Sequence, residues 1–572
     1  MSRAERRKEQ EQRNRTNIAK WILILVIIGF AVLLYFFGPA LISPFQREQL
    51  VPDYTMLYND KPGYEQVLIR EGVTFIPVDW VKDHVLTGLE ILEGREKARW
   101  TPRVDDIRFK AAEVTELAVR ATFPVEVNLL REGNELFFPL SGAEKLMGLR
   151  SEWHPETHIL TVDGIGISYQ QGNLINHAVL RAEPGRFQTT NTELETGETV
   201  RILETLDDYY RVRSGKGLIG YLRQSDVENT GRYTPSIEGT ELAEASPSAL
   251  PNPFGIVWDY VGNSHPDRKD EPVIEALSVY SPTWFELKNP EGELDSSAQF
   301  RYAKTMKNKG YQLWGLVTNA FDPDLTEQFM QNETGRHRFI SQLLVYASLY
   351  ELDGINIDFE NIHYRNQDLF TDFVRELSDA LRMQHLIVSI DVTIPGGSLN
   401  WSQVYDRTAL DPYVDYFAVM TYDEHWGSSP VAGSVASIGW VERGIAATLE
   451  EVPAEKILLG LPFYTRLWTE TPRAGGVSVS SRAMGMQFIR NMLEENDITE
   501  EDWEWDLLAG QYYAEYSIEG VRYRVWLEEE RSIALKGSLI EQYGLAGFAA
   551  WRKGFEVPKI WDVLKEVVET KQ

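Results

Sequence analysis

One stretch of the sequence indicates the fold more clearly than any other: Leu352-Asp-Gly-Ile-Asn-Ile-Asp-Phe-Glu-Asn361. Residues two apart in a β-strand point to the same side, so Asn356, Asp358 and Glu360 would share one face, with the apolar residues between them on the other. Burying two carboxylates costs free energy unless the protein uses them. The pattern therefore predicts a buried functional strand. The alternative is a surface strand or helix start with acids placed by chance.

The C-terminal part of the chain, residues 254–572, alternates between short apolar runs and helix-like stretches, which is typical of α/β architecture. Eight candidate strands in this length predict a (β/α)8 TIM barrel. The longest gap, at about residues 470–530 before the last strand, predicts a small α+β insertion. The candidate strands are residues 255–260, 276–280, 312–318, 354–359, 386–393, 416–420, 456–461 and 545–550.

Composition excludes several classes of function. The formal net charge of −29 argues against nucleic acid as a partner. There is no cysteine, which excludes disulfides and thiol catalysis, and the nine histidines show no metal-binding spacing, so we expect neither a metal nor a cofactor. Aromatic residues make up 12% of the chain, which suits the stacking of sugars but also the filling of large cores.

The N-terminal end predicts a membrane anchor. Residues 21–46 carry no charge and are long enough to cross the roughly 30 Å hydrocarbon layer. Residues 1–20 hold seven Lys or Arg against three Glu, which predicts a cytoplasmic tail. A cleavable signal peptide is the alternative, but residues 38–43 lack a clear cleavage site. We expect a single-pass anchor in the lipid bilayer at residues 21–43, with the rest of the chain on the outer side of the cell membrane.

Two smaller modules are predicted between the anchor and the barrel. Residues 50–168 read as an α+β module, and residues 137–162 within it resemble the N-terminal module of copper amine oxidases, without a copper ligand set. Residues 175–229 contain three strand-like runs and resemble bacterial SH3-type domains, which form small β-barrels. Residues 230–253 are rich in Gly, Ser, Pro and Glu and predict a linker.

Polar residues gather where four of the predicted barrel strands end, which is where barrel active sites lie. The order along the chain is the same as the order of the strands, so the groups would meet at one end of the barrel. These groups are Asp358-Phe-Glu360, Met420-Thr-Tyr-Asp423, Phe463-Tyr-Thr-Arg466 and Trp551.

With these motifs, residues 252–565 resemble the family 18 glycoside hydrolases. The family's DGxDxDxE signature is matched by Asp353-Gly-Ile-Asn-Ile-Asp-Phe-Glu360, in which Asp353 and Gly354 form the structural start of the motif. The family's M-x-Y-D and P-F-Y-x-R motifs and its eighth-strand Trp are matched by residues 420–423, residues 462–466 and Trp551. The form of the motif looks most like the branch of spore-cortex and cell-wall glucosaminidases.

The resemblance implies a role for each residue in substrate-assisted catalysis. Glu360 would protonate the leaving oxygen and later activate water, while the substrate's own acetamido oxygen attacks the anomeric carbon. Asp358 would hold the acetamido N–H and Tyr422 the acetamido oxygen. The remaining residues would bind or position the sugar: Asp423 would fix its distorted ring, Trp551 would form the floor, Arg466 would contact the substrate or Asp423, and Met420 would pack.

Two departures from the family pattern bear on substrate and rate. Asn356 stands where chitinases have an acid that shares a proton with Asp358, so turnover is expected to be slow or its pH optimum moved. Residues 278–285 of the second strand replace the chitinases' S-x-G-G, which disfavours a standard chitinase.

Three functions remain open from the sequence. The first is a membrane-anchored hydrolase that cuts β-1,4 bonds at N-acetylglucosamine, in peptidoglycan. The second is a chitinase or chito-oligosaccharide hydrolase. The third is a lectin-like protein that binds glycans without cutting them, although such members usually lose the acid that is present here as Glu360.

Overall fold

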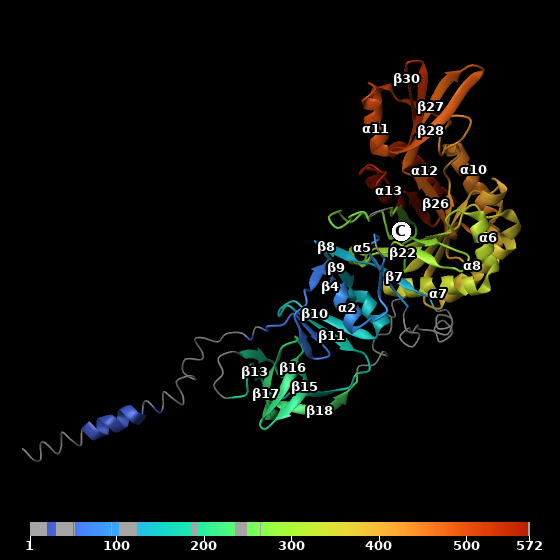
Figure 1. Ribbon diagram of the computed structural model, residues 1–572. Coiled ribbons are helices and arrows are strands. Elements are labelled where there is room, and N and C mark those ends of the chain that lie inside the picture. The colour runs from blue at the N-terminus through green and yellow to red at the C-terminus, as the bar shows by residue number, and fades with distance from the viewer. Residues whose placement is uncertain are drawn as a thin grey trace, which may run out of the picture. The chain divides into compact units, whose positions relative to one another are not determined.

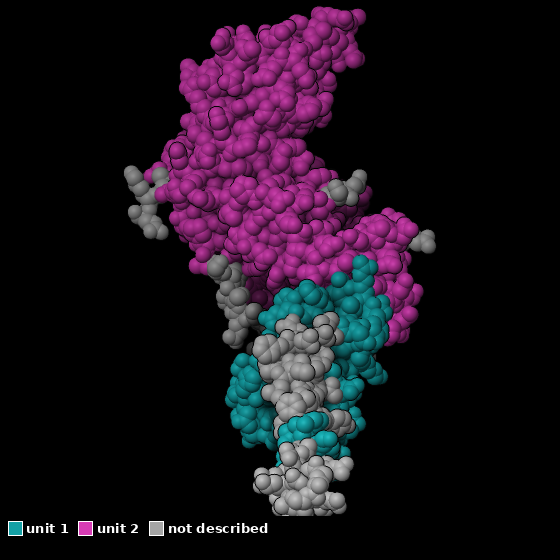
Figure 2. Space-filling model, turned by 90° about the vertical axis from the view of Figure 1, so that its left-hand side faces the viewer, with its two compact units in different colours: residues 1–67, 149–239 teal, residues 68–148, 240–572 magenta. Residues whose placement is uncertain are grey.

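The computed structural model describes residues 20–29, 32, 50, 52–92, 94–101, 123–185, 191–234, 249–262 and 265–569. The chain divides into two compact units, residues 1–67 with 149–239 and residues 68–148 with 240–572 (Figure 2). Residues 20–29, at the start of the expected anchor, are helical, whereas residues 30–31 and 33–43 and the expected tail at 1–19 lie outside the described residues. Within the described part, no helix has the length and apolar character needed to cross a membrane.

Eight parallel strands form a closed barrel in the second unit, which confirms the predicted architecture. Each strand pairs with its neighbour around the ring, and β19 pairs with both β20 and β32 to close it. The strands are β19 (Phe254–Asp259), β20 (Val279–Leu287), β22 (Gln312–Thr318), β23 (Gly354–Asp358), β24 (Ile387–Thr393), β25 (Tyr416–Met420), β26 (Ile457–Pro462) and β32 (Gly547–Trp551).

The second strand differs most from its predicted bounds. The N–H of Leu277 donates to the carbonyl of Ile274, so residues 274–277 form a turn and β20 begins only at Val279. Its end extends to Leu287 because Phe285–Leu287 also pairs with a short antiparallel strand, β21 (Leu294–Ser296). The polar groups at the other strand ends are unaffected.

Helices cover the outside of the barrel (Figure 1). In α8 (Gln367–Arg382), apolar residues recur three or four apart, and those buried include Phe370, Phe373, Val374 and Leu377. Side chains of Asp322 and Asn332 cap the starts of α6 (Pro323–Gln331) and α7 (Glu333–Leu349). The other main helices are α5 (Phe300–Asn308), α10 (Ile438–Leu449), α12 (Glu530–Tyr543) and α13 (Ile560–Val568).

The insertion before the last strand is an α+β subdomain that projects from the carboxyl end of β26 (Figure 1). Its antiparallel sheet has the order β28-β27-β31-β30-β29, and its own apolar core includes Met484, Ile489 and Val525. The insertion starts at Tyr464, directly after β26. Its elements are β27 (Tyr464–Arg473), β28 (Gly476–Gly485), α11 (Met486–Glu494), β29 (Glu504–Asp506), β30 (Gln511–Ile518) and β31 (Val521–Leu527).

Residues 68–148 form small sheets that cluster with the barrel. The N–H of Glu126 donates to the Tyr346 hydroxyl at 3.2 Å, and Lys97 Nζ bonds to Asp295 at 3.0 Å. The strands are β3 (Leu68–Arg70), β4 (Val73–Pro77), β5 (Glu90–Leu92), β6 (Lys97–Trp100), β7 (Val125–Asn128), β8 (Leu130–Glu132) and β9 (Glu135–Pro139), with helix α2 (Val78–His84).

The first unit contains a four-stranded and a seven-stranded sheet, with the orders β10-β11-β1-β2 and β14-β13-β17-β16-β15-β12-β18. Arg201 and Arg213 both bond to Asp60 and Asp163 within this unit. The resemblances to SH3-type and amine-oxidase modules stay predictions. The strands are β1 (Met56–Tyr58), β2 (Lys61–Gly63), β10 (Leu149–His154), β11 (Ile159–Gly164), β12 (Tyr169–Leu174), β13 (Ala178–Arg181), β14 (Asn191–Leu194), β15 (Thr199–Leu206), β16 (Tyr209–Ser214), β17 (Ile219–Arg223) and β18 (Val227–Tyr233).

Candidate active site

The Asp-Gly pair fixes the amino end of β23. Asp353 accepts hydrogen bonds from the N–H of Leu313 at 2.8 Å and from Lys307 Nζ at 2.7 and 2.8 Å. A Cβ on Gly354 would lie 2.8 Å from the Ile387 carbonyl oxygen and 2.9 Å from the Trp314 ring, so only glycine fits there. Both residues therefore lie at the end of the strand opposite the acids, in a structural position.

The inner face of β23 carries the polar residues of the motif. Asn356 is fully buried, and its Oδ1 accepts a hydrogen bond from Trp258 Nε1 at 3.3 Å. It lies opposite Leu316 of β22 and Ser389 of β24 in the register of the sheet. Leu316 and Trp258 belong to the apolar cluster inside the barrel, so Asn356 points into the barrel interior.

Asp358 has a buried acidic neighbour on the next strand. The register of β23 and β24 pairs Ile357 with Ile390, so the following residues, Asp358 and Asp391, lie side by side on the inner face. Both are buried. Burial raises the pKa of the Asp358 carboxyl well above its ordinary range, and the charge of Asp391 raises it further.

Glu360 is held through its backbone. Fully buried Asn319, directly after β22, accepts a hydrogen bond from the Glu360 N–H at 3.0 Å and donates to its carbonyl oxygen at 2.7 Å. Next to it, the Tyr405 hydroxyl donates to the Phe359 carbonyl at 2.8 Å. Burial, followed by the charges of Asp358 and Asp423, raises the pKa of Glu360 well above its ordinary value. Such a carboxyl keeps its proton at higher pH than a free glutamate and can act as an acid.

Residues after β25 and β26 form the opposite side of the site. Asp423 is exposed, and its Oδ1 accepts hydrogen bonds from the Tyr464 hydroxyl at 2.7 Å and from Arg466 Nη2 at 3.0 Å. The Tyr422 ring lies 6.1 Å from that of Tyr464, and burial raises the pKa of its hydroxyl well above the ordinary value. Tyr422 therefore stays a hydrogen-bond donor near Glu360.

The last two predicted residues lie at the same end of the barrel. Trp551 is partly exposed at the end of β32, and its ring lies 6.1 Å from that of Trp258. Met420 ends β25, opposite Thr393, and is half-buried. The structure thus brings together at this end every predicted site residue except Asp353 and Gly354.

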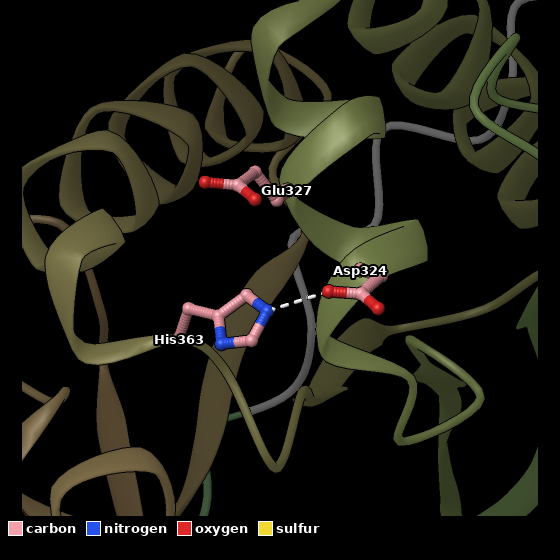
Figure 3. A group of neighbouring side chains, drawn as sticks. All are labelled: Asp324, Glu327 and His363. Atoms are coloured by element: carbon pink, nitrogen blue, oxygen red, sulfur yellow. Dashed lines mark hydrogen bonds and ion pairs between the residues drawn. The ribbon is translucent and has the colours of Figure 1, made fainter.

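A separate acidic group lies beyond β22 and β23, formed by Asp324, Glu327 and His363 (Figure 3). These three are the only side chains among the described residues that are grouped closely enough to hold a metal ion. The His363 ring nitrogen and Asp324 Oδ1 are 2.7 Å apart, but Arg365 donates two hydrogen bonds to Glu327 and lowers the pKa of that carboxyl to about 2. The Glu327 carboxylate is thus already paired with Arg365, which leaves two of the three side chains to bind an ion.

Sequence reasoning missed three residues at the site. Asp391 lies on the same face of its predicted strand as Ser389, and this two-residue spacing could have revealed it. Tyr464 lies inside the motif at residues 463–466 but received no role. No sequence pattern marks Asn319 as a site residue, because it acts on the backbone of a residue 41 positions away.

Comparisons with known proteins show which chains this one is similar to. The sequence model of the protein family described as glycosyl hydrolases family 18 matches residues 284–555. The uncharacterized glycosylase YvbX of Bacillus subtilis (strain 168) is 26% identical over 290 residues, which are 48% of this chain and 80% of that protein. The cortical fragment-lytic enzyme of the same organism is 28% identical over 307 residues, or 52% and 69% of the two chains. A chitinase structure from Chromobacterium violaceum has 21% identity and a TM-score of 0.49, covering 56% of this chain and 99% of its own.

The closed barrel, the acids at the end of β23 and the family match define the class of protein. The chain is a glycoside hydrolase. More particularly, residues 284–555, which include most of the barrel, match the family 18 glycosyl hydrolases.

We predict that Asn319→Ala lowers kcat about 10- to 100-fold, because it frees the backbone of Glu360 and displaces the acid from the bond it must protonate. Steady-state hydrolysis of a glycan by the folded variant measures this effect. Asn496→Ala, which removes a similar side chain-to-backbone bond in the insertion, is the matched control and should leave kcat unchanged. Wild-type kcat in Asn319→Ala would contradict the role of the clamp.

We predict that Asp423→Asn moves the alkaline limb of the kcat/KM profile to lower pH. The negative charge of Asp423 raises the pKa of Glu360, so its removal lowers that pKa, and the acid loses its proton at lower pH. Asp368→Asn, at an exposed carboxyl on α8, should leave the limb in place. An unmoved or upward-shifted limb in Asp423→Asn would rule out this electrostatic coupling.

Proposed function

We propose that the chain hydrolyses β-1,4 bonds at N-acetylglucosamine in peptidoglycan, with retention of configuration. The observation that carries the proposal is the placement of Glu360, held through its backbone by Asn319, beside buried Asp358, where burial raises the pKa of both carboxyls. Family 18 enzymes use the substrate's own acetamido group as the nucleophile, so the protein needs one acid and a group that orients the acetamide. Glu360 and Asp358 supply these two functions.

The first half of the reaction forms a cyclic intermediate. Glu360 gives its proton to the glycosidic oxygen as the bond from that oxygen to the anomeric carbon breaks. The acetamido oxygen bonds to the same carbon, forming an oxazolinium ion, while Asp358 accepts a hydrogen bond from the acetamido N–H. Tyr422 donates to the acetamido oxygen, and this contact orients it for attack.

The second half restores the enzyme. Water attacks the anomeric carbon, its proton passes to Glu360, and the bond from that carbon to the acetamido oxygen breaks. Asp423, tied to Tyr464 and Arg466, holds the sugar from the other side, and Trp551 lies beneath the ring. Two displacements at one carbon retain its configuration.

Exposed aromatic residues support a polymeric substrate. Four large rings lie on segments that follow β19, β22, β24 and β25, and each is between 41% and 53% exposed. Aromatic faces stack on sugar rings, and several of them at one end of the barrel suit a chain of sugars better than a single one. These rings are Tyr260, Phe321, Trp401 and Trp426.

Peptidoglycan is favoured over chitin by two observations. A relative that covers 52% of this chain is named a cortical fragment-lytic enzyme, and the sequence at 278–285 departs from the chitinase pattern. Chitin carries the same N-acetylglucosamine unit, so the same site chemistry would act on it.

We predict that the purified chain releases fragments from peptidoglycan, and that Glu360→Gln lowers this rate about 10²- to 10⁴-fold while glycan binding persists. Mass spectrometry of the products identifies the bond cut, and Glu333→Gln on the exposed start of α7 is the control. Cleavage of chitin oligomers alone would establish the chitinase alternative. Equal absence of products from the wild type and Glu360→Gln, with both binding glycan, would establish a lectin-like protein.

We also propose that residues 21–43 anchor the chain in the cell membrane, with the tail inside and the barrel on the wall side. The uncharged apolar run and its basic flank support this orientation. We predict that the full chain sediments with membranes, and that protease added to wall-stripped cells digests the barrel. A chain that stays in the soluble fraction, or a barrel protected until lysis, would contradict the anchor.

A further inference from the structure

Asp391 is a buried acid for which the reaction described above has no use. It lies on the inner face of β24, opposite Ala418 of β25 and beside Asp358 of β23. The residue is 2% exposed, and its Oδ1 has no hydrogen-bond partner among the described residues. A buried carboxylate that forms no ion pair is costly, so its presence needs a physical reason.

The groups around Asp391 provide no positive charge to neutralise it. Asp358 and Glu360 approach from β23, and the hydroxyls of Tyr405 and Tyr422 interact with it from the segments before α9 (Arg407–Leu410) and after β25. Among the described residues, no Lys, Arg or His forms an ion pair with Asp391. Arg407, which lies near Tyr405, pairs with Glu451 instead.

Two adjacent buried carboxyls without a cation cannot both be ionised, so Asp358 and Asp391 hold one proton between them. Asn356, the neighbour of Asp358 along the strand, is an amide and cannot accept that proton. Burial and Glu360 raise the pKa of Asp391 well above its ordinary value, while Asn356 and Trp258 partly oppose the rise. Both carboxyls are therefore able to carry the proton.

We propose that Asp391 is the proton partner of Asp358 during catalysis. When the acetamido N–H of the substrate approaches, the O–H bond of Asp358 breaks and an O–H bond forms on Asp391. Asp358 becomes the anionic acceptor, the pair keeps its single negative charge, and no proton leaves the barrel. This inference rests on the proposed function, since it assigns a partner to the residue that orients the acetamide.

The polar lining beside the pair suits both arrangements of the proton. Buried atoms without a hydrogen-bond partner among the described residues include Asn356 Nδ2 and Ser389 Oγ. Both residues lie on strands of the barrel, and Ser389 is opposite Asn356. Uncommitted hydroxyl and amide groups can reorient toward whichever carboxyl is charged.

The test measures whether glycan binding releases a proton. Chitohexaose is titrated calorimetrically, in buffers of different ionisation enthalpy between about pH 5 and pH 8, into Glu360→Gln protein with and without Asp391→Asn. With Asp391 present, we expect binding without net proton release. With Asp391→Asn, Asp358 has to lose its proton to solvent, so we expect release approaching one proton and affinity that falls up to tenfold per pH unit on acidification.

A second variant moves the carboxyl from position 391 to position 356 and tests whether binding without proton release returns. Asn356→Asp combined with Asp391→Asn returns an acid to the inner face beside Asp358, and we expect it to restore binding without proton release. A merely structural role for Asp391 would not respond in this way. In protein that retains Glu360, Asp391→Asn should lower kcat at least tenfold, and Asp368→Asn should not.

The outcomes separate this inference from the proposed function. If Glu360→Gln protein that also carries Asp391→Asn binds glycan without proton release at every pH, Asp391 is not the proton partner of Asp358. The proposed function would still stand. Failure of folded Glu360→Gln protein to bind chitohexaose or peptidoglycan fragments would overturn both. Proton release that the Asn356→Asp exchange does not reverse would also count against the pair.

Discussion

Asp358 and Asp391 lie side by side inside the barrel, at the carboxyl ends of β23 and β24, and neither forms an ion pair within the described residues. Burying them together raises the pKa of both, and the charge that the pair retains raises that of Glu360. The acid function of Glu360 therefore depends on where the barrel places its neighbours. Replacing either aspartate by an apolar residue would be expected to stabilise the fold at the expense of this electrostatic arrangement.

The backbone around these carboxyls is held by neutral groups. Asn319 binds both backbone polar groups of Glu360, and Tyr405 binds the carbonyl of Phe359, so the acid is positioned without a cation that would lower its pKa. The cationic group of the site, Arg466, instead contacts Asp423 on the far side. Position and charge are thus controlled by different residues, which lets the carboxyls change protonation while the backbone stays fixed.

The sequence predicted those features that depend on local periodicity. The alternation in β23 revealed its inner face, and the bounds of β22 and β25 agree with the structure because each is a mainly apolar run. The start of β20 was misplaced because a turn at residues 274–277 has the same apolar composition as a strand. The two-residue spacing from Ser389 marks the inner face for Asp391, but its place beside Asp358 arises from register between strands, which a single sequence does not encode. Asn319 could not be assigned because it acts on the backbone of a residue 41 positions away.

The central claim is that burial and the neighbouring acids Asp358 and Asp423 raise the pKa of Glu360 well above its ordinary value. Carbon-13 NMR of side-chain-labelled glutamate, with the Glu360 signal assigned by its loss in Glu360→Gln, measures this directly. The account predicts a titration midpoint well above the ordinary value of 4.5. A midpoint at or below 4.5 would contradict it, because Glu360 would then be ionised when it has to donate its proton.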